Sequence, residues 1–225
     1  MRPPAILFDL DGTLVDSVYY HVLAWREALD AAGIDLAVWR IHRKVGMSGG
    51  LFAQALLRET GCTLDSARIE DLQRRHAAAY RRFQVDIRPL PGARELLARL
   101  TEAGVPWAIA TSGRLETAAL ALSSLGVGAE VPVVTRDLVV HAKPDPDLFI
   151  EAARRLGISI ADAVVVGDSV WDLLAARRAH AIGVGLLSGG YGEDELMRAG
   201  AYRVYEDPRD LLRHLDEIGV RALER

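Results

Sequence analysis

Apolar residues occur in short uninterrupted blocks along much of this chain, and such blocks predict strands that are buried on both faces of a parallel sheet. We expect these strands at residues 5–8, 107–110, 131–134, 163–166, 182–187 and 202–205. Segments of helical spacing lie between the later blocks, at residues 93–103, 115–125, 146–156, 170–179, 193–199 and from 208 onward. This alternation predicts an α/β fold with a doubly wound parallel sheet and helices on both of its faces.

Between the first predicted strand and residue 88 the pattern is helical throughout. A segment that Asp16 or Ser17 can cap carries an apolar stripe to about residue 32, and further helices are expected at 51–60 and 67–83.

The proline-rich residues 88–92 then indicate a linker back to the alternating pattern. We therefore predict an α/β catalytic core formed by residues 1–17 and 88–225. An all-helical cap formed by residues 18–87 is expected to lie over its crevice.

The composition is that of a globular protein with a sizeable core: 225 residues, 50% hydrophobic, with a net charge of -4. This mild acidity argues against nucleic acid as a partner, and no apolar run approaches the roughly 18 residues of a membrane span. The first four residues do not resemble a signal peptide, and Cys62 is the only cysteine, so we expect a cytoplasmic protein without disulfides. The pattern leaves open whether it is a monomer or a dimer.

Two carboxylates, Asp9 and Asp11, follow the first predicted strand and are followed in turn by Gly12. Asp and Gly also favour ordinary turns, so these three residues alone leave a simple strand-ending turn open. A calcium-binding loop is disfavoured because it needs its glycine at the sixth position and a helix before it.

Other predicted strands also end in polar residues. The strand at 107–110 is followed by Thr111, Ser112 and Gly113, and the strand at 163–166 by Asp168, with Asp172 one turn into the next helix.

Lys143 precedes another predicted helix, and it is one of only two lysines among 27 basic residues. The carboxyl ends of strands in a doubly wound sheet share one edge, so we expect these groups to meet in one crevice.

Several carboxylates in one partly buried site must raise their pKa values or bind a cation. An all-oxygen ligand set favours a hard ion, and Mg²⁺ held by few carboxylates commonly accompanies a phosphate-bearing substrate. Lys143 and Thr111 can then bind phosphate oxygens, while an aspartate beside the metal can act as a nucleophile. Asp11 can protonate the leaving oxygen and later activate water, so the set indicates phosphoryl transfer.

The sequences Asp9-Leu10-Asp11-Gly12-Thr13, Thr111, Lys143-Pro144-Asp145-Pro146-Asp147 and Gly167-Asp168-Ser169-Val170-Trp171-Asp172 resemble, in order, the four motifs of the haloacid dehalogenase superfamily. The match spans the whole chain and is similar to the phosphatase branch that carries a helical cap after the first motif.

This resemblance implies that Asp9 is the nucleophile and Asp11 the general acid/base, with Thr111 and Lys143 holding the phosphate. It also implies a magnesium site formed by Asp9, the Asp11 carbonyl and Asp168, with Asp172 bracing the metal or its waters.

Within the superfamily the chain is similar to phosphoglycolate phosphatases and β-phosphoglucomutases, the latter through His21, Ala24 and Trp25. Gly167 before Asp168 and the acid at Asp172 depart from the mutases, so we expect a hydrolase, with a phosphomutase as the alternative.

Other activities are disfavoured. Asp11 argues against a dehalogenase, and Lys44 lacks the context expected of a phosphonatase lysine. The helical insert argues against a signalling receiver domain.

The substrate is expected to be a small soluble phosphate ester. Lys44, Gly46 and Ser48, in a glycine-containing segment before a cap helix, are candidates for its leaving group. Ser112, Gly113 and Arg114 are candidates beside Thr111, although Arg114 could equally form a surface ion pair. His21 is a further candidate, with core packing and hinge duty as alternatives.

We expect His42, His76, His180 and His214 to be structural or exposed, and Arg74, Arg75, Arg81 and Arg82 to form a solvated face.

Overall fold

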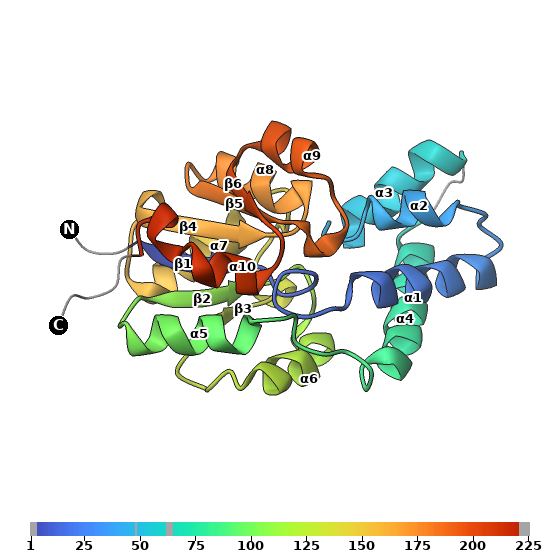
Figure 1. The fold of residues 1–225 in the computed structure, drawn as a ribbon. Coiled ribbons are helices and arrows are strands. Elements are labelled where there is room, and N and C mark those ends of the chain that lie inside the picture. Colours follow the sequence, from blue (N-terminus) through green and yellow to red (C-terminus); the bar gives the residue numbers. More distant parts are fainter. Residues whose placement is uncertain (1–3, 48, 62–64, 221–225) are drawn as a thin grey trace.

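The computed structural model describes residues 4–47, 49–61 and 65–220. One six-stranded sheet, with strands in the order β3-β2-β1-β4-β5-β6, forms the centre of the core (Figure 1). Its strands are β1 (Ala5–Phe8), β2 (Trp107–Ala110), β3 (Val133–Val134), β4 (Ala163–Gly167), β5 (Ile182–Leu186) and β6 (Ala201–Tyr205). Every neighbouring pair is parallel, and β1 lies between β2 and β4. The predicted doubly wound α/β fold is therefore confirmed.

Helices cover both faces of this sheet. They are α5 (Ala93–Glu102), α6 (Leu115–Leu125), α7 (Asp147–Leu156), α8 (Val170–Arg178), α9 (Glu193–Ala199) and α10 (Pro208–Arg213). Short 3-10 helices occur at Arg136–Leu138, Ile160–Asp162, Leu187–Gly189 and Leu215–Ile218. Because side chains alternate along β1, Ile6 and Phe8 join the hydrophobic cluster on one face while Leu7 joins the cluster on the other.

Four further helices lie beyond the carboxyl ends of the strands (Figure 1): α1 (Val18–Ala31), α2 (Val38–His42), α3 (Gly49–Thr60) and α4 (Ser66–Phe83). We call them the cap. They share a hydrophobic cluster of their own, which includes Trp25, Leu29, Phe52 and Leu72. This cluster gives the cap a packed interior of its own, while Ala24, Ala79 and Tyr80 of the cap also join the hydrophobic cluster of the core.

The two chain segments that connect the cap to the sheet run side by side. The amide of Asp16 donates to the carbonyl of Arg88 over 2.9 Å, and the amide of Leu90 donates to the carbonyl of Leu14 over 2.9 Å. These bonds fix where α1 leaves the core, directly after Asp9 and Asp11.

One predicted strand boundary was wrong, and one predicted N-cap residue lacks its side-chain capping bond. Strand β3 begins at Val133 rather than 131, because Val131 donates its amide to Gly128 in a turn and Pro132 has no amide to donate. Ser17 occupies the N-cap position of α1 but makes no capping hydrogen bond. Its hydroxyl donates instead to Asp11 Oδ1 over 2.6 Å.

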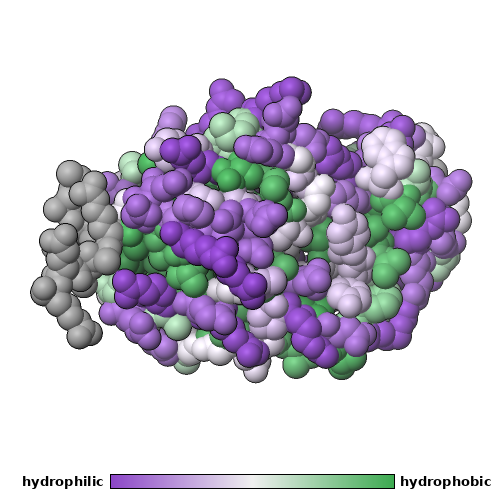
Figure 2. All heavy atoms as spheres, in the orientation of Figure 1, coloured by the Kyte–Doolittle hydropathy of each residue, from purple (hydrophilic) through white to green (hydrophobic). Residues whose placement is uncertain are grey.

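Hydrophilic side chains cover most of the face shown in Figure 2, and hydrophobic ones form small separate patches there. In the part of the chain that the structure describes, no helix combines the length and the apolar character needed to cross a bilayer.

Candidate active site

A cavity of about 1070 Å³ lies between the carboxyl ends of the strands and the cap. The core contributes several predicted site residues to its lining: Asp9, Asp11, Thr111, Ser112, Gly113 and Arg114. The cap contributes both predicted and unpredicted residues: His21, Trp25, Lys44, Gly46, Phe52 and His76. The sheet topology therefore brings residues that are far apart in the sequence to one edge, as the pattern of strand ends predicts.

Asp9, which lines the cavity, belongs to a compact group of three buried acids. Asp9 follows β1, Asp168 follows β4 and Asp172 lies in the first turn of α8. Each can offer one carboxylate oxygen such that all three oxygens lie within 4.8 Å of one another. All three residues are buried, with exposed fractions of 6%, 4% and 1%.

Lys143 is the cation that faces this group. It is completely buried, its Nζ contacts Asp9 Oδ1, and the same Nζ lies 2.8 Å from Asp172 Oδ1. Burial alone would lower the pKa of Lys143, but Asp172 and Asp9 raise it above its ordinary value. Lys143 therefore stays charged and orients Asp9.

One ammonium does not neutralise three carboxylates. Burial, followed by the charge of Asp172, raises the pKa of Asp168 well above its ordinary value. Burial also raises the pKa of Asp9 to about 7, against the opposing effect of Lys143. A divalent cation would supply the missing positive charge, and the all-oxygen donor set suits a hard ion such as Mg²⁺. The residues present therefore fit the expected metal.

The side chain of Asp168 is held from several sides. Thr13 Oγ1 donates to Asp168 Oδ1 over 2.9 Å. Gly12, at φ +83, turns the chain after Asp11, and a Cβ there would lie 2.6 Å from Asp168 Oδ2. A Cβ at Gly189 would overlap the same oxygen. Only glycine at position 189 therefore leaves Asp168 in its observed place, a requirement that nothing in the sequence pattern indicates.

Asp172 is oriented by the start of its own helix. Its Oδ2 accepts hydrogen bonds from Ser169 Oγ over 2.6 Å and from the Ser169 amide over 3.1 Å. This capping box leaves Oδ1 to face Lys143.

Asp11 has different neighbours from the three-acid group. Its Oδ1 accepts from Ser17 Oγ over 2.6 Å and from the Tyr80 hydroxyl over 3.4 Å, and it lies 3.3 Å from His21 Nε2. Burial opposes ionisation, but His21 and Ser17 outweigh it and lower the pKa of Asp11 below its ordinary value. A metal ligand role for Asp11 through its main-chain carbonyl stays a prediction.

The loop after β2 offers polar groups beside these acids. Thr111 is buried, and its Oγ1 accepts the Gly113 amide over 2.9 Å. Ser112 Oγ is also buried and has no hydrogen-bond partner among the residues that the structure describes. An unpaired buried hydroxyl is costly unless a ligand satisfies it, and a phosphate oxygen could do so.

The predicted leaving-group residues have mixed surroundings. Lys44 is buried beside the cavity, and its Nζ lies 2.6 Å from Glu59 Oε1. Gly46 lines the cavity with φ +92, and a Cβ there would lie 3.1 Å from Ser169 Oγ. Arg114 lines the rim and also forms an ion pair with Asp137 over 3.2 Å. Ser48 lies outside the described residues.

His76 was expected to be structural or exposed, but it lines the cavity. Its ring stacks on Trp25 with centroids 4.2 Å apart, and its Nε2 lies 3.1 Å from His21 Nδ1. Arg74 and Arg81, expected on a solvated face, also line the cavity while they pair with nearby acids. Helix α4 carries charged residues on several sides, so its sequence did not indicate which side faces the cavity.

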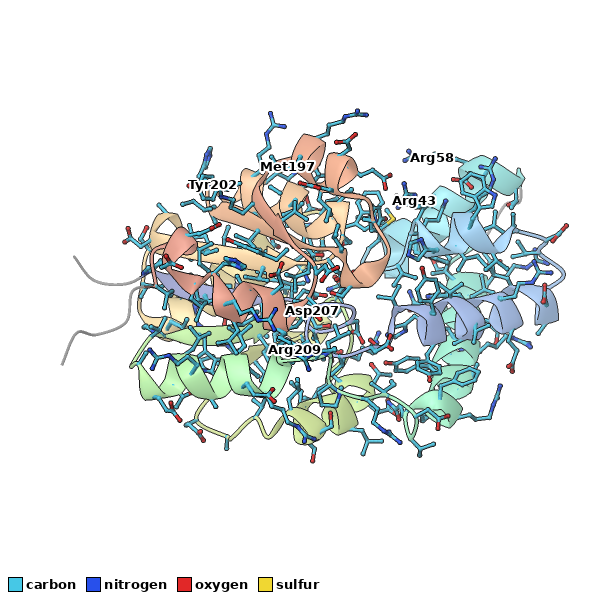
Figure 3. All side chains as sticks on the ribbon, viewed as in Figure 1. Arg43, Arg58, Met197, Tyr202, Asp207 and Arg209 are labelled. Carbon is cyan, nitrogen blue, oxygen red and sulfur yellow. The ribbon has the colours of Figure 1, made fainter. Side chains whose placement is uncertain are left out.

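The cap contacts the core at a second place, around Arg43 (Figure 3). The carbonyl of Arg43 accepts from Trp171 Nε1 over 3.2 Å and from the Tyr191 hydroxyl over 3.1 Å, while its guanidinium contacts Glu195. His42 Nε2 lies 2.8 Å from the Gly189 carbonyl. These contacts hold the cap over the cavity from the side opposite the two connecting segments.

Comparisons with known proteins agree with this arrangement. Hexitol phosphatase A of Escherichia coli is 33% identical over 82% of this chain and 84% of its own length. The N-acetylmuramic acid 6-phosphate phosphatase of Pseudomonas aeruginosa is 32% identical over 96% of both chains. A phosphoglycolate phosphatase of Agrobacterium fabrum is 31% identical over 83% of this chain and 81% of its own length.

A solved hydrolase from Pseudomonas syringae is 56% identical, with a TM-score of 0.94 over 96% of this chain and 99% of that chain. The family model described as haloacid dehalogenase-like hydrolase matches residues 3–180. On the strength of that match and of these relatives, the chain belongs to the haloacid dehalogenase-like hydrolases.

Proposed function

We propose that this protein is a magnesium-dependent phosphatase that hydrolyses a small phosphate ester, with the phosphoryl group carried transiently on Asp9. The observation that carries the proposal is the position of Asp9, whose carboxylate contacts Lys143 and belongs to the buried group of Asp168 and Asp172. The relatives named as phosphatases support the same reaction class.

In the first step the carboxylate of Asp9 attacks the phosphorus of the ester, and the bond from phosphorus to the leaving oxygen breaks. The negative charge of the bound ester favours the acid form of Asp11, against the effect of His21 and Ser17, and Asp11 gives its proton to that leaving oxygen, so that a neutral alcohol departs. Lys143 and the hydroxyls of Thr111 and Ser112 would bind the other phosphate oxygens.

In the second step a water molecule attacks the phosphorus of the acyl phosphate on Asp9. Asp11, now a carboxylate, takes the proton of that water, and the bond between phosphorus and Asp9 breaks to release inorganic phosphate. Asp11 thus serves first as an acid and then as a base. At the end of the cycle Asp9 is free and Asp11 again carries a proton.

Asp9, Asp168 and Asp172 would hold Mg²⁺, together with the carbonyl of Asp11. The bound ion would offset negative charge on the carboxylates and on the transferring phosphoryl group. Thr13 and Ser169 would keep the ligands Asp168 and Asp172 in place.

The cavity above Asp9 is large enough for a leaving group of several carbon atoms and is lined by both acids and bases. Hexitol phosphates, sugar phosphates and phosphoglycolate, the types of compound named for the relatives, are therefore suitable first substrates to test.

The test is a panel of these esters with Mg²⁺, in which released phosphate and isomerised sugar phosphate are both measured. We expect phosphate release from at least one ester and its loss on chelation of the metal. Isomerised sugar phosphate that forms without net phosphate release, and only after a bisphosphate primer, would replace the phosphatase with a phosphomutase.

A further inference from the structure

The two oxygens of the Asp11 carboxylate have different surroundings. Oδ1 accepts hydrogen bonds from Ser17 and Tyr80 and faces His21 Nε2. Oδ2 receives no hydrogen bond from the residues that the structure describes, and it lies on the side of Gly113, where an added Cβ would be 3.8 Å away. Oδ1 is therefore anchored, while Oδ2 remains available for proton transfer near the loop that follows β2.

Among the groups that contact Asp11 Oδ1, His21 differs because its ring proton can occupy either of two nitrogens. A neutral imidazole carries its proton on either Nδ1 or Nε2, and only an Nε2–H can donate to Asp11 Oδ1. With the other tautomer a lone pair would face the carboxylate and repel it. What contacts His21 Nδ1 therefore decides how well Asp11 is held.

The group that contacts His21 Nδ1 is His76 Nε2, at 3.1 Å. The His76 ring is fixed between neighbours, because it stacks on Trp25 at 4.2 Å and Trp25 stacks on Phe52 at 4.1 Å. Burial lowers the pKa of His76 well below its ordinary value, with the neighbouring His21 acting in the same direction. His76 therefore stays neutral, and in the tautomer with its proton on Nε2 it donates one hydrogen bond, which His21 Nδ1 can accept.

We propose that His76 is a positioning residue for Asp11: by donating its Nε2–H to His21 Nδ1, it keeps the Nε2–H of His21 directed at Asp11 Oδ1. The chain of contacts runs from α4 of the cap through α1 to the general acid/base of the core. This inference rests on the proposed function, because it concerns the residue that protonates the leaving oxygen.

Stacking and hydrogen bonding by His76 can be separated with two variants. His76→Phe keeps an aromatic ring against Trp25 and loses the hydrogen bond. His76→Gln loses the ring but places an amide group where it can donate to or accept from His21. Leu72→Ala, in the same cap cluster but outside the lining of the cavity, is the matched control for disturbed cap packing.

The kinetic test compares kcat/KM for the best alkyl ester of the substrate panel with kcat/KM for p-nitrophenyl phosphate. The alkoxide needs the Asp11 proton, whereas p-nitrophenolate leaves without one, so a defect in the general acid affects the alkyl ester selectively. We expect His76→Phe to lower kcat/KM at least about tenfold for the alkyl ester and less than about threefold for the aryl ester. His76→Gln and Leu72→Ala should keep the wild-type ratio of the two values. Equal losses on both esters in His76→Phe, or a Gln variant that behaves like the Phe variant, would overturn the proposal.

A second measurement needs no turnover. The ring nitrogen chemical shifts of His21, measured by NMR on the ¹⁵N-labelled protein, report which nitrogen carries the proton. We expect a protonated Nε2 in the wild type and in His76→Gln, and a mixture of tautomers in His76→Phe. An unprotonated His21 Nε2 in the wild type, or unchanged shifts in His76→Phe, would overturn the inference. If the wild type hydrolysed neither ester, the proposed function would fail, and these shifts would still decide whether His76 orients His21.

Discussion

The Nζ of Lys143 lies 2.8 Å from Asp172 Oδ1, and both side chains are about 1% exposed. Removing one partner of a buried ion pair leaves the other charge without compensation, which is strongly destabilising. Here the loss is larger than for an isolated pair, because Lys143 also contacts Asp9. The same lysine therefore contributes to stability and to the proposed chemistry.

We expect Lys143→Met to lower the free energy of unfolding by about 3–5 kcal/mol, measured by urea denaturation without metal at pH 8. The matched control is Arg178→Met, which removes the exposed ion pair with Asp145 and should cost less than about 1 kcal/mol. Equal unfolding midpoints for Lys143→Met and the wild type would contradict the role given to this pair.

Magnesium should stabilise the protein through the three-acid group. At a Mg²⁺ concentration about 100 times the Kd, the wild type should gain about 2.7 kcal/mol, seen as a rise in the melting temperature. Asp168→Asn should need at least about tenfold more Mg²⁺ for the same rise, because it loses a charged ligand. Glu151→Gln, an acid that pairs with Arg154 and Arg155 on the surface, should respond like the wild type. An unchanged Mg²⁺ response in Asp168→Asn would place the metal elsewhere.

Gly189 provides a steric test of the same site. A Cβ at this position would overlap Asp168 Oδ2, so Gly189→Ala should displace that carboxylate and weaken Mg²⁺ binding about tenfold or more. Gly50→Ala is the control, since a Cβ at Gly50 would meet nothing within 4 Å. Calorimetric titration with Mg²⁺ measures the affinity of both variants. A wild-type affinity in Gly189→Ala would show that Mg²⁺ binding does not require the observed position of Asp168.

His76 should make the stability of the protein depend on pH. Its pKa in the folded protein is lowered well below the ordinary 6.5, so below that pH the unfolded chain binds a proton that the folded protein does not. The contribution of His76 to the free energy of unfolding is therefore fully present above about pH 6.5. It is lost as the pH falls, by up to about 1.4 kcal/mol per pH unit.

His76→Gln removes this titration, so its unfolding free energy relative to the wild type should rise between pH 7 and pH 5. Asp9 and Asp168 titrate with the opposite sign, but they are present in both proteins and cancel in the difference. A pH-independent difference, from urea denaturation across this range, would mean that His76 titrates normally in the folded protein.

The sequence predicted the sheet well, because strands buried on both faces are continuous apolar blocks that end at polar residues. Asp9, Thr111 and Asp168 could be placed at one edge for that reason alone. The edge strand β3 was predicted less well, because it is short and Pro132 interrupts its hydrogen bonding.

The cap side of the cavity could not be predicted to the same degree. His76 and Phe52 reach the cavity only because helices distant in the sequence pack together, and helical periodicity does not say which partner a face meets. Likewise, the demand for glycine at position 189 arises from one contact with Asp168 across a long stretch of chain.

The central claim is that Asp9 carries the phosphoryl group, and Asp9→Asn tests it most directly. Asparagine keeps the size of the side chain but is a poor nucleophile, so phosphate release should fall by at least about a thousandfold. The melting temperature should stay close to that of the wild type, because Lys143 keeps its ion pair with Asp172 and burial already opposes a charge on Asp9. The measurement is phosphate released from the best ester of the panel by purified Asp9→Asn with Mg²⁺. The account predicts a folded protein without turnover, and phosphate release near the wild-type rate would contradict it.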